Sequence, residues 1–408
     1  MSRAPLWSNP RRLCAASFFV DLAHYLVFGA IPFQAIRLGA DPFVLGLIPS
    51  LFAVTYVAAS MLAGRFSDGA SRLALVRNGI FFFLIVTTAI AFASRIEILL
   101  GLIPFTGIVL GLFWPPAQAA ISDETPPHQL SRALAEFNVA WTSGKGLGFF
   151  LAGVLTQALR PEAAVLSGAI PLVAALFIVP RRAPSAMERP PVLASNPASD
   201  RDSDPASVPG SVAPPSRSAR NFILLAWTAN AFAYGVSSTF HVHAPVLLVD
   251  RGENAFDFGA FLGIVFAIQA ISFAALARRI PSVRDLAAAY AMGILSLIIF
   301  LFVPGFWGEI VSAIPLGLSL ALAYHASLHA SLYRERGRGL AAGVHEGVIG
   351  IGSSLVPLAG GMLAAQGSLK APFALCLIFL CAGLAITTAF GREFAKRSES
   401  HPAKANRS

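Results

Sequence analysis

Long apolar stretches alternate with short polar segments along almost the whole chain. Most of these stretches reach the ~20 residues that an α-helix needs to cross ~30 Å of hydrocarbon. The first is too long for the core of a signal peptide and no small-residue cleavage site follows it, so we expect it to remain as a helix. The pattern predicts twelve membrane-spanning helices, over residues 13–36, 42–64, 73–94, 98–121, 133–158, 163–180, 221–249, 256–277, 286–304, 306–332, 339–364 and 371–390.

One long segment near the middle breaks this pattern. Residues 181–220 are rich in arginine, proline and serine and lack hydrophobic periodicity, a composition that cannot bury enough apolar surface to fold. We interpret this segment as a flexible cytoplasmic linker. It separates an N-terminal six-helix half, residues 1–180, from a C-terminal half, residues 221–391, which is followed by a cytoplasmic tail at 392–408.

Composition supports a polytopic membrane protein. The 408 residues are 56% hydrophobic and only 12% charged, against roughly 25% charged in soluble proteins. The net charge of +9 does not indicate nucleic acid, because the basic residues concentrate in alternate loops. By the positive-inside rule this bias places both termini and the linker in the cytoplasm, and we expect a bacterial inner (plasma) membrane. On the outside we expect only Arg37, Arg95, Arg160, Arg251 and Lys370.

The two halves repeat one another weakly at a nearly constant offset. Parallel repeats of this kind predict a substrate site near the bilayer midplane, between the halves. The matching pairs are Ile103-Pro104 with Ile314-Pro315, Arg132-x-Leu134 with Arg338-x-Leu340, and Leu151-Ala152-Gly153 with Leu358-Ala359-Gly360.

The loop between the second and third predicted helices, Gly64-Arg65-Phe66-Ser67-Asp68-Gly69-Ala70-Ser71-Arg72, carries a family resemblance. It resembles the G-x-L-x-D-R-x-G-R-R signature of the major facilitator superfamily, which Gly64, Asp68 and Arg72 match. Gly69, Ser71 and Leu73 depart from it. With the twelve spans, the linker and the repeat, the resemblance covers the whole chain. It implies an all-α fold of two six-helix parallel repeats that rock about a central site, and a gating role for Gly64, Asp68 and Arg72.

Two further comparisons with that superfamily bear on the direction of transport. Gly144, Gly148 and Gly153 resemble the glycine-rich fifth helix of its exporter branches, although Phe149 stands where those proteins have proline. Close helix packing through small residues explains the same glycines. In the fourth helix Ile103 occupies the place of the arginine of proton-coupled drug exporters, so the proton-relay role of that arginine cannot be assigned here.

Lys145 is the sharpest site candidate. A charge at the bilayer centre costs at least ~2.5–3.5 kcal/mol on insertion scales, and Lys145 lies ~18 Å along the fifth predicted helix. Asn138 and Thr142 share its helical face. Two interpretations remain open: Lys145 binds an anionic group of the substrate, or it forms a buried ion pair with Asp21 of the first helix.

Polar side chains also form stripes on other predicted helices. Helical spacing places each stripe on one face, which should point inward. The superfamily resemblance implies that the first, fourth, seventh and tenth helices line the cavity. The candidates are Asp21, His24, Tyr25 and Phe28 on the first helix, Trp114 and Gln118 on the fourth, and Asn230, Tyr234, Ser237 and His241 on the seventh.

A second polar group lies towards the cytoplasmic ends of the tenth and eleventh predicted helices. It contains His325, His329, His345 and Glu346. Because histidine titrates near physiological pH, we expect His325 and Glu346 to handle protons or to act in gating. Histidines at i and i+4 are also a possible metal pair, so a metal-handling membrane protein remains an alternative, although no metal site is assigned.

These features together predict a secondary transporter of a small organic solute, coupled to protons. Export of an amphipathic metabolite or drug is our first hypothesis, and uptake of a small organic anion is the alternative. We expect no enzymatic activity and no cofactor, because the sequence has no glycine-rich phosphate loop and no nucleophile elbow. Cys14, Cys376 and Cys381 fall in apolar runs and suggest no disulfide. The expected partners are the solute, protons and the lipid bilayer, with no nucleic acid, and we expect a monomer.

Overall fold

The computed structural model describes residues 9–66, 72–126, 129–179, 217–276, 279–332 and 338–400, and these residues contain helices but no β-strand. The N-terminal half comprises α1 (Asn9–Arg37), α2 (Pro42–Phe66), α3 (Arg72–Ala91), α4 (Ile96–Glu124), α5 (Leu130–Ala158), α6 (Pro161–Ser167) and α7 (Ala169–Ile178). The C-terminal half comprises α8 (Arg217–Asp250), α9 (Ala255–Leu276), α10 (Val283–Phe302), α11 (Phe306–Leu332), α12 (Arg338–Ala364) and α13 (Ala371–Ser400).

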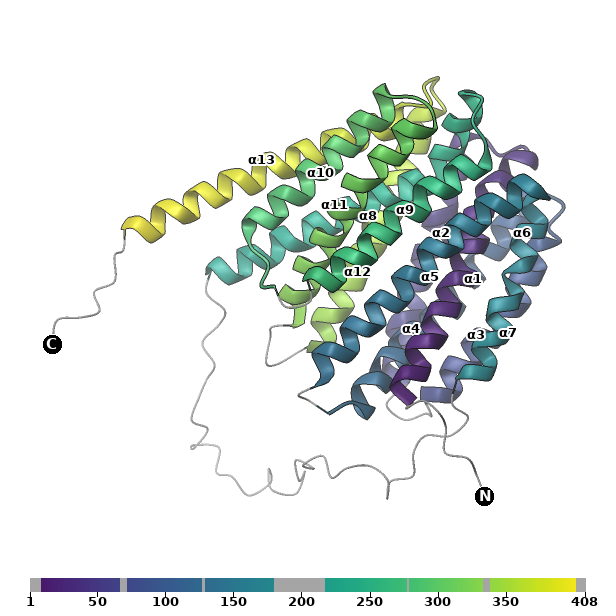
Figure 1. Ribbon diagram of the computed structural model, residues 1–408, viewed down its shortest axis with the longest axis horizontal. Coiled ribbons are helices and arrows are strands. Elements are labelled where there is room, and N and C mark those ends of the chain that lie inside the picture. Colours follow the sequence, from purple (N-terminus) through teal and green to yellow (C-terminus); the bar gives the residue numbers. More distant parts are fainter. Residues whose placement is uncertain are drawn as a thin grey trace, which may run out of the picture.

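The helices follow the predicted spans closely. Within the described residues, eleven helical segments are long and apolar enough to cross a membrane, with α6 and α7 counted as one span. The more polar α5 is the twelfth helix of the predicted set and does not meet that criterion. Two boundaries differ from the prediction: α8 begins at Arg217, inside the segment interpreted as linker, and α13 continues past residue 390 to Ser400. Figure 1 shows α13 extending beyond the other helices.

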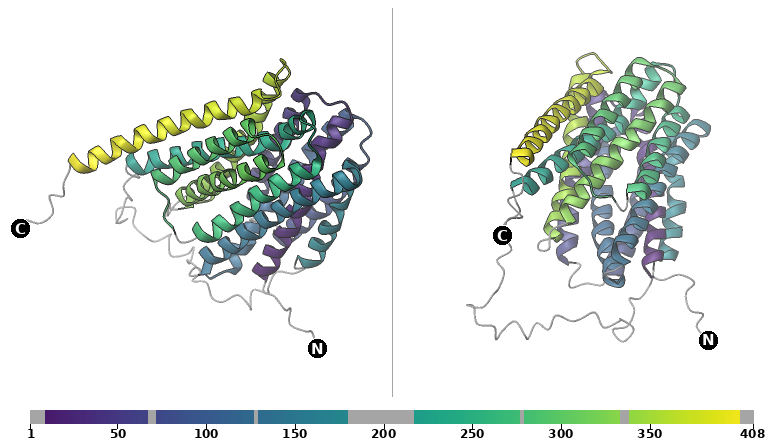
Figure 2. Two further views of the ribbon diagram at one scale, coloured as in Figure 1. Left: turned by 45° about the horizontal axis from the view of Figure 1, so that its top comes forward. Right: turned by 60° about the vertical axis from the view of Figure 1, so that its left-hand side comes forward.

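The two halves lie side by side in the bundle (Figures 1 and 2). Their internal packing repeats: α1 packs on α5 and α2 on α4 in the first half, as α8 packs on α12 and α9 on α11 in the second. The halves meet through two interfaces that the repeat also relates, α2 with α12 and α5 with α9. The weak sequence repeat therefore corresponds to a repeat of structure.

Glycines allow the close approach at both of these interfaces. A Cβ atom on Gly153 of α5 would lie 2.5 Å from the carbonyl oxygen of Ala255 in α9. A Cβ atom on Gly46 of α2 would lie 2.5 Å from the carbonyl oxygen of Pro357 in α12. Because both neighbours are backbone atoms, a larger residue at either glycine would force the two halves apart.

The interfaces are not equally tight at the two ends of the bundle. We name the end where α1 begins and α7 ends the linker end, and the end where α1 finishes at Arg37 the distal end. Near the distal end, the start of α2 packs against the last turns of α12, where a Cβ on Gly361 would lie 2.6 Å from the oxygen of Pro42. Towards the linker end, α4 and α11 share no comparable interface in the described part of the chain. The halves are thus closed against each other at the distal end.

Candidate functional site

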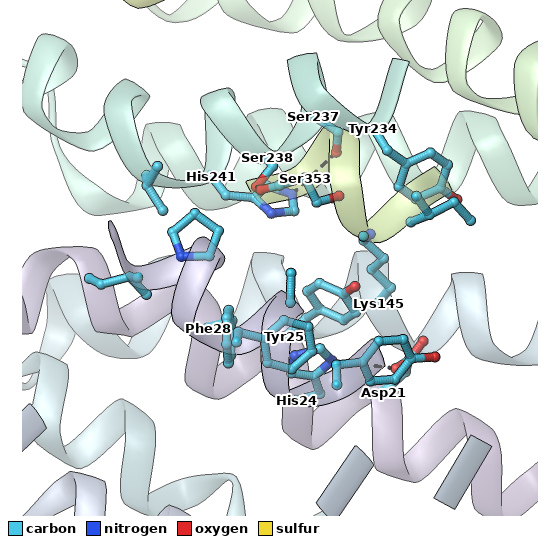
Figure 3. A pocket seen from close by; sticks show the side chains of 18 of the residues that line it. Asp21, His24, Tyr25, Phe28, Lys145, Tyr234, Ser237, Ser238, His241 and Ser353 are labelled. Atoms are coloured by element: carbon cyan, nitrogen blue, oxygen red, sulfur yellow. Dashed lines mark hydrogen bonds and ion pairs between the residues drawn. The ribbon is translucent and has the colours of Figure 1, made fainter. Parts of the chain in front are cut away.

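A cavity of about 170 Å³ lies between the two halves. Helices α1, α2, α4 and α5 line it from the first half, and α8, α11 and α12 line it from the second. Figure 3 shows the α1 side chains on one side of this cavity and the α8 side chains on the other, with Lys145 of α5 extending between them. The cavity therefore occupies the position that the parallel repeat predicts for a substrate site.

The structure brings most of the predicted site residues together at this cavity. Trp114 and Phe28, from the same predicted stripes, also line it, as does Ser237. The lining residues that were predicted as the cavity set are Asp21, His24, Tyr25, Gln118, Lys145, Tyr234, His241 and Glu346.

Four predicted residues do not line the cavity. Asn138 accepts a hydrogen bond from Trp141 Nε1 at 3.0 Å, and the Thr142 hydroxyl donates to the Asn138 carbonyl oxygen at 2.7 Å. These bonds keep both side chains along the surface of α5. Asn230 is fully buried within the second half. The ring of His325 makes its contact outside the cavity, with Nε2 2.8 Å from the carbonyl oxygen of Arg279.

Several lining residues were not predicted. Tyr56 and Phe52 come from α2, Trp141 from α5 and Tyr324 from α11, and all of them add aromatic surface to the cavity. The sequence could have predicted Ser353 as a lining residue, because it lies seven residues after Glu346 and so on the same face of α12. The sequence could not have predicted the aromatic lining residues, because aromatic residues within an apolar span face lipid, the protein core and cavities alike.

Lys145 is held by aromatic rings rather than by a carboxylate. Its side chain is almost fully buried, and its Nζ lies 4.0 Å from the ring centroid of Phe266, 4.3 Å from that of Tyr25 and 5.7 Å from that of Tyr234. We call these three rings the aromatic cage. Among the described residues no carboxylate lies within ion-pair distance of Nζ, so the alternative of a direct ion pair with Asp21 is not realised in this structure.

The cage draws on both halves. Tyr25 belongs to α1, Tyr234 to α8 and Phe266 to α9. Each half thus contributes a tyrosine ring to one ammonium group. Cation–π contacts of a desolvated ammonium are worth about 2 kcal/mol or more. That contribution lowers the cost of burying Lys145 but supplies no opposite charge.

Asp21 and His24 form a polar group on the α1 side of the cavity. Asp21 Oδ1 lies 3.7 Å from His24 Nδ1, and both side chains are buried. Neither ring nitrogen of His24 has a hydrogen-bond partner among the described residues, although its ring packs against those of Tyr25, Phe28 and Phe52. On the opposite wall, the ring of His241 lies with Nε2 3.4 Å from the Ser237 hydroxyl. Both histidines therefore remain available to a solute, a water molecule or a proton.

The second predicted group is dispersed. Glu346 lines the cavity, facing the Tyr56 hydroxyl, whereas His345 points away and its Nδ1 lies 2.7 Å from the Ser327 hydroxyl. The rings of His325 and His329 are 6.2 Å apart. In the described ranges no three histidine, cysteine, aspartate or glutamate side chains are placed to hold a metal ion. The metal-handling alternative gains no support from this geometry.

The predicted gating residues lie at the linker end. Gly64 is in the last turns of α2, and Asp68 falls outside the described residues. Arg72 begins α3 and forms an ion pair with Asp123 near the end of α4. This pair joins two neighbouring helices of the first half, so what Asp68 contacts stays a prediction.

Comparison with known proteins decides the family. The sequence profile of the Major Facilitator Superfamily matches residues 13–329. The chain belongs to this superfamily. Its fold and its place among multi-pass membrane transporters therefore agree with the prediction from the loop signature, the twelve spans and the repeat.

Individual relatives of the superfamily add less. The chain is 32% identical to an uncharacterised MFS-type transporter of Methanocaldococcus jannaschii over 120 residues, which are 29% of this chain and 31% of that relative. Two crystal structures of a bacterial homologue of the human lysosomal transporter Spinster share the fold. The inward-facing, occupied form has a TM-score of 0.72 at 15% identity and covers 95% of this chain and 97% of its own. The inward-facing, unoccupied form has a TM-score of 0.70 at 17% identity and covers 96% and 99%.

Proposed function

We propose that the chain is a secondary active transporter that carries a small amphipathic organic solute through the central cavity by alternating access. The observation that carries this proposal is the cavity itself, which both halves line with charged and aromatic side chains. A solute bound there contacts both halves at once, so a rocking motion of the halves can expose it first to one side of the membrane and then to the other. The expected setting is a bacterial plasma membrane.

We place the linker end in the cytoplasm on the basis of the basic residues in its loops. The closed distal end then faces the outside, and the arrangement corresponds to a state that faces inward. The likeness of the fold to two inward-facing structures supports this assignment. Transport by this scheme needs a second state, in which α2 separates from α12 and α5 from α9 at the distal end.

Protons are the proposed coupling ion. Asp21 and Glu346 are carboxylates within the cavity, one from each half, His24 lies 3.7 Å from the first of them, and His241 lines the same cavity. Groups of this kind in a membrane span mark ion and proton pathways in transporters. A proton taken up from one side and released to the other would tie solute movement to the proton gradient.

Two directions of transport have different support. Export of an amphipathic metabolite or drug agrees with the aromatic walls of the cavity. The glycines of α5, which resemble those of exporters, give export less support than the sequence suggested. Gly144 and Gly148 face the backbone of α1, and Gly153 faces α9, so packing accounts for them. Uptake of a small organic anion is the second candidate. The ammonium of Lys145, which has no carboxylate partner in the described residues, favours an anionic solute.

Reconstitution tests the proposal. Solutes that raise the thermal stability of the purified protein are selected first, and their flux into proteoliposomes is then measured with and without an imposed pH gradient. We expect at least one stabilising solute to move faster than in protein-free liposomes, and Asp21→Asn to abolish the dependence on the gradient. If stabilising solutes bind but none is transported in either direction, the protein is a sensor or assembly factor with a transporter fold.

A further inference from the structure

We propose that the aromatic cage presents Lys145 as the binding group for a carboxylate of the solute, and that Asp21 takes up one proton when this carboxylate binds. The transported species is then an organic acid, carried as its anion together with a proton. This inference rests on the proposed transport function and names its substrate class and its coupling.

Lys145 carries a charge on a buried side chain. A buried ammonium group requires compensation, and removing one partner of a buried pair is costly because it leaves the other charge unpaired. The cage surrounds Nζ with three rings and no carboxylate from the described residues lies within ion-pair distance. Lys145 nevertheless lines the cavity. An anion that enters the cavity can therefore reach the ammonium and make the ion pair that the folded chain does not supply.

The aromatic cage spans both halves of the chain. Lys145 projects from the first half, whereas Phe266 and Tyr234 of the cage belong to the second. An anion held at Nζ therefore sits where the halves touch, and it must bind differently once they move apart. A ligand shifts a conformational equilibrium only by its difference in affinity for the two states. Because the cage draws on both halves, an anion bound at Nζ should have different affinities for the two states.

Binding of an anion at Lys145 changes the charge around Asp21. Asp21 shares the cavity with Lys145 and interacts electrostatically with it. While the cavity is empty, the charge of the Lys145 ammonium favours the ionised form of Asp21, and burial of the carboxyl group opposes it. A bound carboxylate neutralises that ammonium and adds a second negative charge, which favours protonation of Asp21. By linkage, protonation of Asp21 in turn strengthens anion binding.

Other titratable groups share the cavity with Asp21 and set the conditions of the test. They are His24 on α1, Lys145 on α5, His241 on α8 and Glu346 on α12, together with tyrosines on α1, α2, α8 and α11. Protonation of the histidines would oppose proton uptake by Asp21 at low pH. Proton uptake should therefore be measured at pH 7.5, where both histidines are neutral in their ordinary range.

The remaining walls describe the rest of the solute. Phe28, Phe52 and Trp114 line the cavity in addition to the cage, so the body attached to the carboxylate should be apolar, and a flat ring can pack against these side chains. Such pockets bind through apolar surface and use a few polar groups for orientation. Aryl carboxylates are thus suitable probes, and Trp114 and Trp141 in the wall supply an intrinsic fluorescence signal.

The experiment measures charge selectivity and proton uptake on the full chain in detergent. Phenylacetate, 3-phenylpropionate and indole-3-acetate are titrated against the matching primary amides and amines. Calorimetry in buffers of different ionisation enthalpy gives the protons taken up per ligand. We expect the carboxylates to bind at least ten-fold more tightly than the amides, with close to one proton taken up at pH 7.5. Lys145→Met should lose that preference, and Asp21→Asn should bind carboxylates without proton uptake.

Controls separate the possible failures. Lys370→Met and Asp250→Asn remove an exposed lysine and an exposed aspartate outside the cavity and should change neither quantity. If Lys145→Met does not fold, Lys145→Gln is used, and thermal unfolding reports the state of each variant. Equal binding of amides and carboxylates, carboxylate binding without proton uptake in the wild type, or no carboxylate binding at millimolar concentration would each overturn the inference. Flux of a neutral or cationic solute in proteoliposomes would leave the transport function standing, whereas no flux of any solute would remove both.

Discussion

The Ser50 hydroxyl of α2 donates a hydrogen bond to the carbonyl oxygen of Ser354 in α12 at 2.9 Å, across the boundary between the halves. The same hydroxyl lies 3.3 Å from the Gly46 carbonyl oxygen one turn earlier. Ser50 is buried. The bond therefore belongs to the state closed at the distal end and must break before that end can open.

Replacing Ser50 tests whether this hydrogen bond stabilises the state that is closed at the distal end. Ser50→Ala removes a buried hydrogen bond that contributes about 1 kcal/mol, so the population open at the distal end should rise about five-fold. A single cysteine at Val242, on the distal side of the cavity, should then react faster with a membrane-impermeant thiol reagent added from outside. The reagent needs a version of the chain without its three native cysteines. Unchanged labelling would show that the bond does not hold the closed state.

Replacing Gly46 should act in the same direction but more strongly. Gly46→Val places a side chain against the backbone of Pro357 and Leu358, and overpacking of this kind typically costs 1–3 kcal/mol. We expect transport to fall at least ten-fold because the distal end cannot close, while the protein still folds. Gly101→Val is the matched control, since nothing lies within 4 Å of a Cβ at that position. Equal activity of the two variants would contradict the expectation.

Glu309 offers a prediction about stability. It is fully buried in the first turn of α11, and neither of its carboxyl oxygens has a hydrogen-bond partner in the described part of the chain. The carboxyl group of Glu253 lies beside it, and the nearby Arg251 donates instead to the Phe300 carbonyl oxygen at 3.2 Å.

Glu309→Gln should therefore stabilise the protein by about 1 kcal/mol, because a neutral amide removes the repulsion and can donate to Glu253. The gain should be larger at pH 8 than at pH 5, because with rising pH the folded chain must either bury the charge of Glu309 or keep this carboxyl group protonated, whereas the amide does not titrate. Thermal unfolding at the two pH values measures it, with Glu97→Gln at the exposed start of α4 as the control. A lower unfolding temperature at pH 8 would mean that the carboxylate has a partner.

Orientation remains a prediction from the basic residues. A cysteine introduced at Ser203, in the predicted linker and outside the described residues, should be labelled only from the cytoplasmic side. Inverted and right-side-out membrane vesicles give the two readings, and a cysteine at Ser368 in the turn after α12 should give the opposite result. Labelling of Ser203 from outside in intact cells would reverse the topology and the side on which the cavity opens.

The sequence predicts the helices well because a span must be apolar over ~20 residues regardless of its neighbours. It does not predict the break at Gly168 between α6 and α7, since the apolar run is continuous there. It also does not predict that α13 continues as far as Ser400, because the residues after 390 are polar and a polar segment can be helical outside the membrane.

The site was predicted in part for a similar reason. Helical spacing places Asp21, His24 and Tyr25 on one face, and burial of that face brings them to the cavity. Spacing does not specify depth, so Asn138 shares the face of Lys145 but lies two turns nearer the linker end, with its amide bound by Trp141. Nothing in the sequence predicts that Phe266 contacts Lys145. It meets Lys145 only because α5 packs against α9, a contact between residues far apart in the sequence.

The position of α5 between α1 and α9 has a consequence for how the chain is made. Gly144 and Gly148 allow α5 to pack closely against α1, and Gly146 and Gly153 allow it to pack closely against α9. During synthesis, α5 leaves the ribosome before α9 exists. The nascent N-terminal half must then hold Lys145 in the bilayer without Phe266, and Asp21 on the neighbouring α1 is the carboxylate at hand. We therefore expect α5, which does not meet the hydropathy criterion of a span by itself, to depend on α1 for its insertion, with Asp21 as the counter-charge of Lys145 at that stage.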